Sequence, residues 1–372
     1  MEAMEAESSL ERAMIARARE TKTPINGSIE LLPLCNMNCG MCYVRLSRQE
    51  MERQGRLRGA EEWLALARQM EQAGVLFLLL TGGEPLLYPE FKTLYPALKK
   101  LGMILTVNTN GTLIDEDWAA FFGQHKPRRV NVTLYGADDG AYERLCRCPG
   151  GFEKALRGIR LLRREGVDVK IGCSVTRQNR QDLERILALG RELDVPVRMD
   201  TYMMPGTRER GRPFDEQSRL GPEQAAEARI CALKGEMGPE LWSQYVNESI
   251  RQTEREAPRH SRQVTCMAGN CSFTVNWQGE MRPCVVLSEP SVPVFETGFA
   301  EAWRQITEKN GKILLNEKCA RCSMRPLCRT CAACALLETG DYQGLPDYMC
   351  RYAEESLRLL RREEKEIPRG SF

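Results

Sequence analysis

The stretch VLFLLLTGGEP at residues 75–85 decides which fold the sequence predicts. Its first six residues are all apolar, which is typical of a strand buried on both faces in a parallel sheet. Gly82 and Gly83 come where this strand ends, and two residues without side chains let the backbone approach a ligand closely. Glu84 adds a carboxylate at the same place. The motif is also compatible with a plain tight turn, so it does not identify a site by itself.

Short apolar runs followed by helical patterns recur on both sides of this stretch. Strands are predicted over residues 28–34, 75–80, 103–107, 129–134, 167–175 and 195–202, and helices over 61–73, 91–100, 115–122, 152–165 and 181–193. Strands that alternate with helices through short loops predict an α/β fold with a parallel sheet. Ligands of such folds bind at the carboxyl ends of the strands, where Asn110, Thr133 and Ser174 add small polar side chains.

Three cysteines follow the first predicted strand, in the sequence CNMNCGMC at residues 35–42. Thiolates at Cys35, Cys39 and Cys42 can hold three corners of a cubic iron–sulfur cluster and leave its fourth iron without a protein ligand. A structural zinc site needs four protein ligands, and no further Cys or His lies near this loop in the sequence. The spacing therefore favours an iron–sulfur cluster with one open iron.

The composition is that of a soluble globular protein. A chain of 372 residues is longer than chains that fold around a single hydrophobic core usually are. The length therefore predicts one large domain and one smaller domain. The 53 Lys and Arg against 51 Asp and Glu give no support for a nucleic-acid partner or an anionic membrane surface. No signal peptide or membrane-spanning stretch is visible, so a reducing cytoplasm is expected. In that compartment the 16 cysteines indicate metal or redox sites rather than disulfides.

The last third of the chain is rich in cysteine. Nine cysteines fall within it, at Cys266, Cys271, Cys284, Cys319, Cys322, Cys328, Cys331, Cys334 and Cys350. A hairpin predicted over residues 273–284, with its turn at Gln278-Gly279, presents Cys284 beside the two cysteines that precede it. Iron–sulfur clusters and a pair of zinc sites would both account for this number of cysteines.

The three-cysteine loop after the first strand and the Gly-Gly-Glu-Pro after the second resemble the core of the radical S-adenosylmethionine (radical SAM) superfamily. The resemblance implies a partial (β/α)6 barrel, in which Cys35, Cys39 and Cys42 hold a [4Fe–4S] cluster whose free iron binds SAM. It also implies contacts to SAM from the strand ends. These residues are Gly82, Gly83 and Glu84 at the amino group, Thr133 and Ser174 at the ribose and carboxylate, Tyr43 near the adenine, and Asn110 in the surrounding polar ring.

The C-terminal cysteines resemble the SPASM extension of that superfamily, which binds two auxiliary [4Fe–4S] clusters. The resemblance implies two ligand sets. The second cluster takes Cys319, Cys322, Cys328 and Cys350, and the first takes Cys266, Cys271, Cys284 and one further cysteine. That last ligand is either Cys331 or Cys334, because the spacing departs from the family pattern at this point, and Cys331 is favoured.

The same resemblance predicts how the chain is divided. Residues 1–27 are an N-terminal extension, residues 28–225 the radical SAM core, residues 226–262 a helical bridge and residues 263–372 the SPASM domain. No feature of the composition contradicts this division.

Enzymes that resemble this sequence mostly act on peptides, particularly ribosomally made precursors. The implied reaction removes a hydrogen atom from the peptide through a 5′-deoxyadenosyl radical and passes an electron to the auxiliary clusters, which gives a thioether or carbon–carbon cross-link. An electron donor such as flavodoxin or ferredoxin is implied as a partner. A formylglycine-forming, sulfatase-maturing enzyme and a peptide epimerase are alternatives. From another class, a zinc-bearing scaffold that binds a peptide without chemistry is a further alternative.

Three residues are candidates for proton or hydrogen-atom transfer. Asp138 and Asp200 lie near predicted strand ends and could take a proton from the substrate. Cys148 lies outside both cysteine groups and could give a hydrogen atom in an epimerase. The competing interpretation is that the carboxylates are solvated and that the cysteine has no role.

Overall fold

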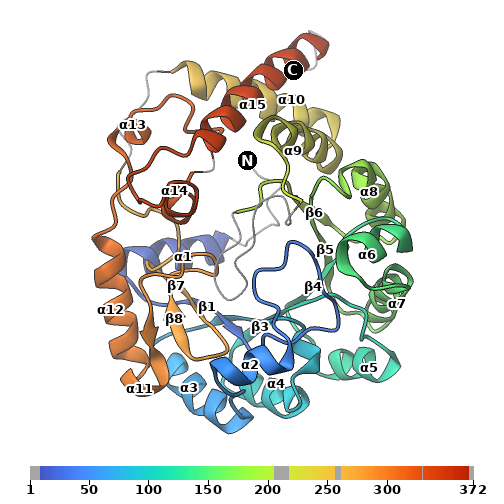
Figure 1. Cartoon of the computed structure of the whole chain (residues 1–372), viewed down its shortest axis with the longest axis vertical. Coiled ribbons are helices and arrows are strands. Elements are labelled where there is room, and N and C mark those ends of the chain that lie inside the picture. Colours follow the sequence, from blue (N-terminus) through green and yellow to red (C-terminus); the bar gives the residue numbers. More distant parts are fainter. Residues whose placement is uncertain (1–8, 205–217, 256–260, 329, 368–372) are drawn as a thin grey trace.

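A parallel sheet forms the centre of the computed structural model, which describes residues 9–204, 218–255, 261–328 and 330–367 (Figure 1). Its six parallel strands are β1 (Asn26–Glu30), β2 (Phe77–Thr81), β3 (Ile104–Thr109), β4 (Arg129–Thr133), β5 (Val169–Ser174) and β6 (Val197–Asp200). They lie side by side in chain order. The predicted α/β fold with a parallel sheet is confirmed.

The first strand is shorter than its predicted range of 28–34. β1 ends at Glu30, and Pro33 has no N–H to continue the ladder. The chain beyond β1 is instead held to the end of β2, since the N–H of Gly83 donates to Leu32 O (2.7 Å) and that of Glu84 to Leu34 O (2.9 Å). These bonds fix where the cysteine loop begins.

The predicted helices lie on the outside of the curved sheet (Figure 1). They are α3 (Ala60–Gln72), α4 (Phe91–Lys100), α5 (Glu116–Gln124), α7 (Gly151–Arg164) and α8 (Leu183–Glu192). Two short helices were not predicted, α2 (Arg48–Gln54) and α6 (Asp139–Cys146). Ser47 and Glu50 form a reciprocal capping box at the start of α2. Asp138 caps α6, because its carboxylate accepts a hydrogen bond from the N–H of Ala141.

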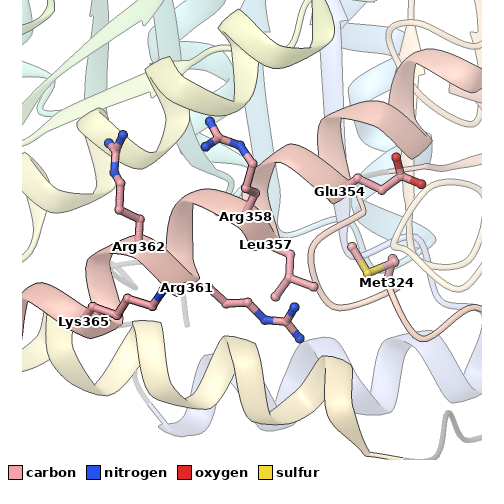
Figure 2. A pocket seen from close by; sticks show the side chains of 7 residues that line it. All are labelled: Met324, Glu354, Leu357, Arg358, Arg361, Arg362 and Lys365. Atoms are coloured by element: carbon pink, nitrogen blue, oxygen red, sulfur yellow. The ribbon is translucent and has the colours of Figure 1, made fainter.

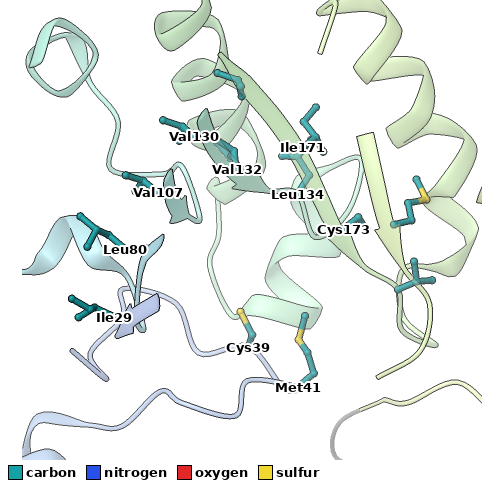
Figure 3. Packing of buried hydrophobic residues seen from close by; sticks show 14 of the residues in the cluster. Ile29, Cys39, Met41, Leu80, Val107, Val130, Val132, Leu134, Ile171 and Cys173 are labelled. Carbon is teal, nitrogen blue, oxygen red and sulfur yellow. The ribbon is translucent and has the colours of Figure 1, made fainter. Parts of the chain in front are cut away.

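The main hydrophobic core lies between the sheet and these helices. Figure 3 shows side chains of neighbouring strands that meet there, among them Ile29, Leu80, Val107, Val132 and Ile171. All five are fully buried. Complete burial of such a side chain stabilises the fold by about 1.5–3 kcal/mol. This core keeps the carboxyl ends of the strands in fixed relative positions.

The C-terminal region continues the same sheet. β7 (Ser272–Val275) pairs in parallel with β1, and β8 (Glu280–Arg282) and β9 (Val292–Pro293) follow antiparallel. The predicted hairpin over residues 273–284 is therefore confirmed. Gly27 permits the β1–β7 pairing, because a Cβ at this position would lie 2.4 Å from the Phe273 ring. The strand that follows the barrel-like core in sequence thus lies against its first strand.

The remaining helices complete the molecule. They are α1 (Ser9–Thr21), α9 (Pro222–Glu236), α10 (Pro239–Glu254), α11 (Val294–Thr297), α12 (Phe299–Gly311), α13 (Glu317–Ala320), α14 (Ala332–Thr339) and α15 (Asp347–Glu366). Figure 1 shows α15 beside α9 and α10, at the end of the molecule away from α3 and α4. None of the helices in the described ranges has both the length and the apolar character that a bilayer crossing demands.

Candidate active site

A cavity of about 440 Å³ opens at the carboxyl ends of the strands. It is lined by most of the predicted site residues. They are Cys35, Cys39, Cys42, Tyr43, Gly82, Gly83, Asn110, Thr133, Ser174 and Asp200. The structure therefore brings the three-cysteine loop, the glycine motif and the polar strand ends together around one space, as the parallel topology requires.

The cysteine loop is fixed by backbone hydrogen bonds to α6. The N–H of Asn38 donates to Cys146 O (2.9 Å), and the N–H of Gly40 donates to Leu145 O (3.0 Å). The thiol of Cys146 also bonds the sulfur of Cys39, and this hydrogen bond lowers the pKa of Cys39. The structure places Cys146 under the loop, where it positions Cys39.

Hydrogen-bond donors surround the other two sulfurs of the loop. The N–H of Met37 lies 3.4 Å from Cys35 Sγ, the side-chain amide of Asn110 lies 3.7 Å from the same atom, and the N–H of Arg45 lies 3.3 Å from Cys42 Sγ. Donors of this kind favour thiolates. Burial opposes them and raises the pKa of Cys35 to about 12. Metal binding at this thiol therefore has to displace a proton.

These residues fit an iron–sulfur cluster with three protein ligands. The three sulfurs line one cavity, and thiolates are the ligands that such clusters take. Among the described residues, no three His, Cys, Asp or Glu side chains are placed closely enough to hold a single metal ion. The polar residues on the opposite wall leave space for a second group beside the loop.

The two glycines of the motif are required by the backbone itself. A Cβ at Gly82, whose φ is +146°, would lie 2.5 Å from Leu32 O, and a Cβ at Gly83 would lie 2.2 Å from Leu34 O. Real Cβ atoms do not approach backbone oxygen so closely. The glycines thus allow the end of β2 to pass against the segment that leads into Cys35, in addition to leaving room for a ligand.

Glu84 does not line the cavity. Its side chain is completely buried, and it accepts hydrogen bonds from Thr109 Oγ1 (2.8 Å), the N–H of Asn110 (2.8 Å) and the N–H of Leu86 (3.1 Å). Burial raises the pKa of Glu84 to about 7, and these three bonds oppose that rise. The carboxylate holds the end of β3 against the turn after β2. Its contribution to the site is to position Asn110.

Replacing Glu84 by Gln should lower the free energy of unfolding at pH 8 by about 1–3 kcal/mol. The reason is that the amide NH₂ of Gln would face one of the three donors, and two donors cannot bond each other. Chemical denaturation of both proteins at pH 8 measures the difference. Glu116→Gln is the control, because Glu116 is exposed and forms an ion pair with Arg157 on the surface. Equal stability of the Glu84 and Glu116 variants would contradict this role.

A buried amide joins the next two strand ends. Asn179 donates from Nδ2 to Tyr135 O (2.9 Å) and Ser174 O (3.1 Å), and its Oδ1 accepts from the N–H of Thr176 (2.7 Å). These bonds connect the ends of β4 and β5, where Thr133 and Ser174 line the cavity. Asn179 is therefore a positioning residue for this wall.

The structure separates the three candidates for proton or hydrogen-atom transfer. Asp200 lines the cavity at the end of β6. Asp138 caps α6 and pairs with Arg185 at 2.9 Å, and these contacts lower its pKa. Cys148 is half-buried next to Gly151 at the start of α7. Only Asp200 of the three is among the residues that line the cavity.

Sequence reasoning missed several residues of the cavity wall. They are Met37, Met41, Val44, Tyr202, Met203, Met204 and Val286, whereas Thr81, Asn108, Thr109 and Tyr135 lie at the strand ends where the site was expected. Tyr202 is the last residue of the strand predicted over 195–202 and comes two residues after the end of β6, so its place at a strand end was a usable signal. Val286 had no such signal, because it comes from the region after β8 and reaches the cavity only through the β1–β7 pairing. The C-terminal region thus supplies part of the wall.

Four C-terminal cysteines line a second, smaller cavity of about 100 Å³. They are Cys319, Cys322, Cys328 and Cys350, from α13, the loop after it and α15. Burial raises the pKa of Cys350, and the other three sulfurs add to the rise because they are near. These four are the set that the sequence resemblance implies for one cluster, and four thiolates around one space fit such a group.

A further group of cysteines lies around Cys284. Burial raises the pKa of Cys284 to about 11, and the nearby Cys331 and Cys266 contribute to the rise. Cys271 is near Cys266 and is itself buried under α1. Cys334 is placed differently, because its sulfur lies 2.9 Å from the hydroxyl of Tyr202 in the wall of the large cavity.

Comparison with known proteins identifies relatives of the chain. Residues 29–190 match the Radical SAM superfamily. The AdoMet-dependent heme synthase of Methanosarcina barkeri is 25% identical over 332 residues, covering 84% of this chain and 92% of that protein. A PqqA peptide cyclase of Granulibacter bethesdensis is 26% identical over 338 residues, covering 86% of this chain and 85% of that protein.

Solved structures share the fold. The structure of anSMEcpe with bound AdoMet and the Kp18Cys peptide has a TM-score of 0.65 at 19% identity, covering 92% of this chain and 100% of the other. Streptococcus suis SuiB bound to precursor peptide SuiA also has a TM-score of 0.65, at 17% identity, with 92% and 80% covered. The family implies SAM and one [4Fe–4S] cluster as cofactors. Residues 29–190 therefore form a domain of the radical SAM superfamily, and the chain that contains them is an enzyme.

Proposed function

We propose that this enzyme oxidises a peptide and forms a thioether or carbon–carbon cross-link in it, most naturally in a ribosomally made precursor. The observation that supports an oxidative outcome is the four-cysteine cavity of Cys319, Cys322, Cys328 and Cys350. With all four cysteines bound, a cluster there would have no iron open to substrate, so its role would be electron transfer. The similarity to a PqqA peptide cyclase supports a peptide as the substrate.

The large cavity has suitable walls for such a substrate. When bound, SAM and the cluster of the cysteine loop supply the radical that removes a hydrogen atom. The chain contributes Asn110, Thr133 and Ser174 as hydrogen-bonding groups on one wall. Met203, Met204 and other apolar side chains on another wall exclude water from the reacting centre. Asp200 at the rim is the carboxylate positioned to take a proton from the substrate.

We further propose that Cys266, Cys271, Cys284 and Cys331 hold the other auxiliary cluster. Two arguments support Cys331 over Cys334. Cys331 is one of the sulfurs whose proximity raises the pKa of Cys284. Cys334 instead contacts the Tyr202 hydroxyl. The SPASM region of residues 263–372 would then hold two clusters, and the sheet that joins it to the core keeps them at a fixed distance from the large cavity.

Anaerobic reconstitution with iron and sulfide should give about twelve irons per chain, since three cubic clusters hold four irons each. Iron and sulfide assays of the desalted protein, with zinc measured by emission spectrometry, provide the count. A result of about four irons together with bound zinc would contradict the auxiliary clusters and would favour zinc in the C-terminal region. Treatment of the same sample with a chelator under air provides the apo control.

A tetrapyrrole is the second candidate for the substrate class. The observation in its favour is the 25% identity to an AdoMet-dependent heme synthase across 84% of this chain. Hemin binding changes the visible absorption spectrum of the pigment, so an anaerobic titration with hemin tests this class directly.

For a peptide substrate, mass spectrometry should detect the loss of two hydrogens per cross-link. Formylglycine formation and epimerisation, the other peptide outcomes, differ from a cross-link in fragmentation and in amino-acid chirality.

A further inference from the structure

An exposed row of basic side chains lies on α15 beside the four-cysteine cavity. We name it the basic strip, and it consists of Arg358, Arg361, Arg362 and Lys365. Together with Met324, Glu354 and Leu357 these residues line an open groove of about 620 Å³ (Figure 2). The spacing of three and four residues places them along one side of the helix.

Packing does not require the basic strip. α15 packs on α9 and α10 through its apolar residues, and Leu359, Leu360 and Tyr352 are buried there. All four basic side chains are exposed. Removing their charge would therefore leave the hydrophobic contacts of the helix in place.

Neighbouring acids neutralise only part of the strip. Arg358 pairs with Glu355 (2.6 Å), and Arg361 pairs with Glu254 (3.3 Å). Arg362 and Lys365 have no ion-pair partner within the described residues. Since the whole chain has a net charge of only +2, this positive charge is a local feature rather than a general property of the surface.

The strip is continuous with the four-cysteine cavity. Met324 and Glu354 line both the groove and that cavity. A protein that covers the groove would therefore lie directly against the wall formed around Cys328 and Cys350. If the strip were only a solvated helix face, there would be no reason for it to lie beside the four-cysteine cavity.

We propose that the basic strip is the docking surface for an acidic one-electron carrier protein of the flavodoxin type. The inference rests on the proposed function, because it takes the adjacent cysteine cavity to be a redox site. Encounters between redox proteins are weak and have small interfaces. A positive strip opposite a negative surface raises their association rate and orients the partners, in a manner that salt suppresses.

The test compares two charge-reversal variants of the reconstituted full-length enzyme. R361E/R362E/K365E reverses three charges of the strip. R157E/R160E/R164E reverses three exposed arginines of α7, which lies away from α15 in Figure 1, and it changes the net charge equally. An acidic flavodoxin is the probe, and its Kd is measured by calorimetry at low and at physiological salt.

We expect the strip variant to weaken flavodoxin binding at least tenfold at low salt and to lose most of its salt dependence, while the α7 variant binds as the wild type does. Iron content and SAM cleavage driven by dithionite, which needs no carrier protein, should be equal in all three proteins. Equal flavodoxin affinity in the two variants overturns the inference. So does a strip variant that loses affinity for an acidic precursor peptide but keeps flavodoxin binding.

The same samples separate this inference from the proposed function. Wild-type enzyme with about four irons refutes the auxiliary clusters on which the inference rests. Wild-type enzyme with about twelve irons, combined with unchanged flavodoxin binding by the strip variant, refutes the docking surface alone.

Discussion

Alanine at Cys35, Cys39 and Cys42 together should abolish the formation of 5′-deoxyadenosine from SAM. The three sulfurs line the large cavity, so their removal leaves this part of the site without thiols that could bind a cluster. The iron count should fall from about twelve to about eight per chain, because the C-terminal cysteines are unchanged. Chromatography of the reaction with dithionite and SAM measures the nucleoside, and the iron assay is performed on the same sample.

The matched control is Cys231→Ala. Cys231 is exposed on α9 and lies outside both cysteine groups, so its loss should change neither the nucleoside yield nor the iron count. Circular dichroism of the triple variant checks that the fold persists. Nucleoside formation at the wild-type rate in the triple variant would overturn the assignment of the loop.

The sequence was sufficient for the sheet because its strands are short, mainly apolar runs. Residues 75–80 are all apolar, residues 103–107 contain one polar residue, Thr106, and the two runs correspond to the parallel strands β2 and β3. The short helices α2 and α6 were harder to predict, because α2 has one buried residue, Met51, and α6 spans only eight residues. The Ser47 and Glu50 capping box was nevertheless a readable signal for α2.

The candidate site was predictable to the extent that strand ends define it. Parallel strands place residues such as Thr133 and Ser174 at the same edge of the sheet, and this placement does not depend on the conformation of the loops. Contacts between segments that are far apart in the sequence were not predictable. The side chain of Glu84 is buried and accepts a hydrogen bond from the N–H of Asn110, and Cys146 supports the cysteine loop through its backbone carbonyl. No local pattern marks such partners.

The C-terminal region contributes to the same site through the sheet. β7 lies against β1, and the chain after β8 brings Val286 to the cavity wall. Tyr202 connects the two regions, because its ring lines the cavity and its hydroxyl bonds both Cys334 and Glu338. Glu338 in turn forms a buried ion pair with Arg219. This network holds α14 against the end of β6, so the cysteines near α14 have fixed positions relative to the cavity.

Cys331→Ala should remove about four irons per chain, whereas Cys334→Ala should remove none. The physical reason is the different surroundings of the two thiols. Cys331 lies near Cys284, and Cys266 is near both. Cys334 is fully buried against Tyr202, which occupies its sulfur with a hydrogen bond of 2.9 Å. Iron assays and the electron paramagnetic resonance spectra of the reduced proteins measure the loss.

Cys334→Ser is the companion variant, because it keeps a hydrogen-bonding group opposite Tyr202 while removing the sulfur. It should retain about twelve irons and the wild-type melting temperature, whereas Cys334→Ala leaves a small void and should melt lower. If both Cys334 variants lose about four irons and Cys331→Ala keeps them, the ligand assignment is reversed. In that case binding of the cluster would have to break the Tyr202 contact, and Tyr202 would move within the wall of the large cavity.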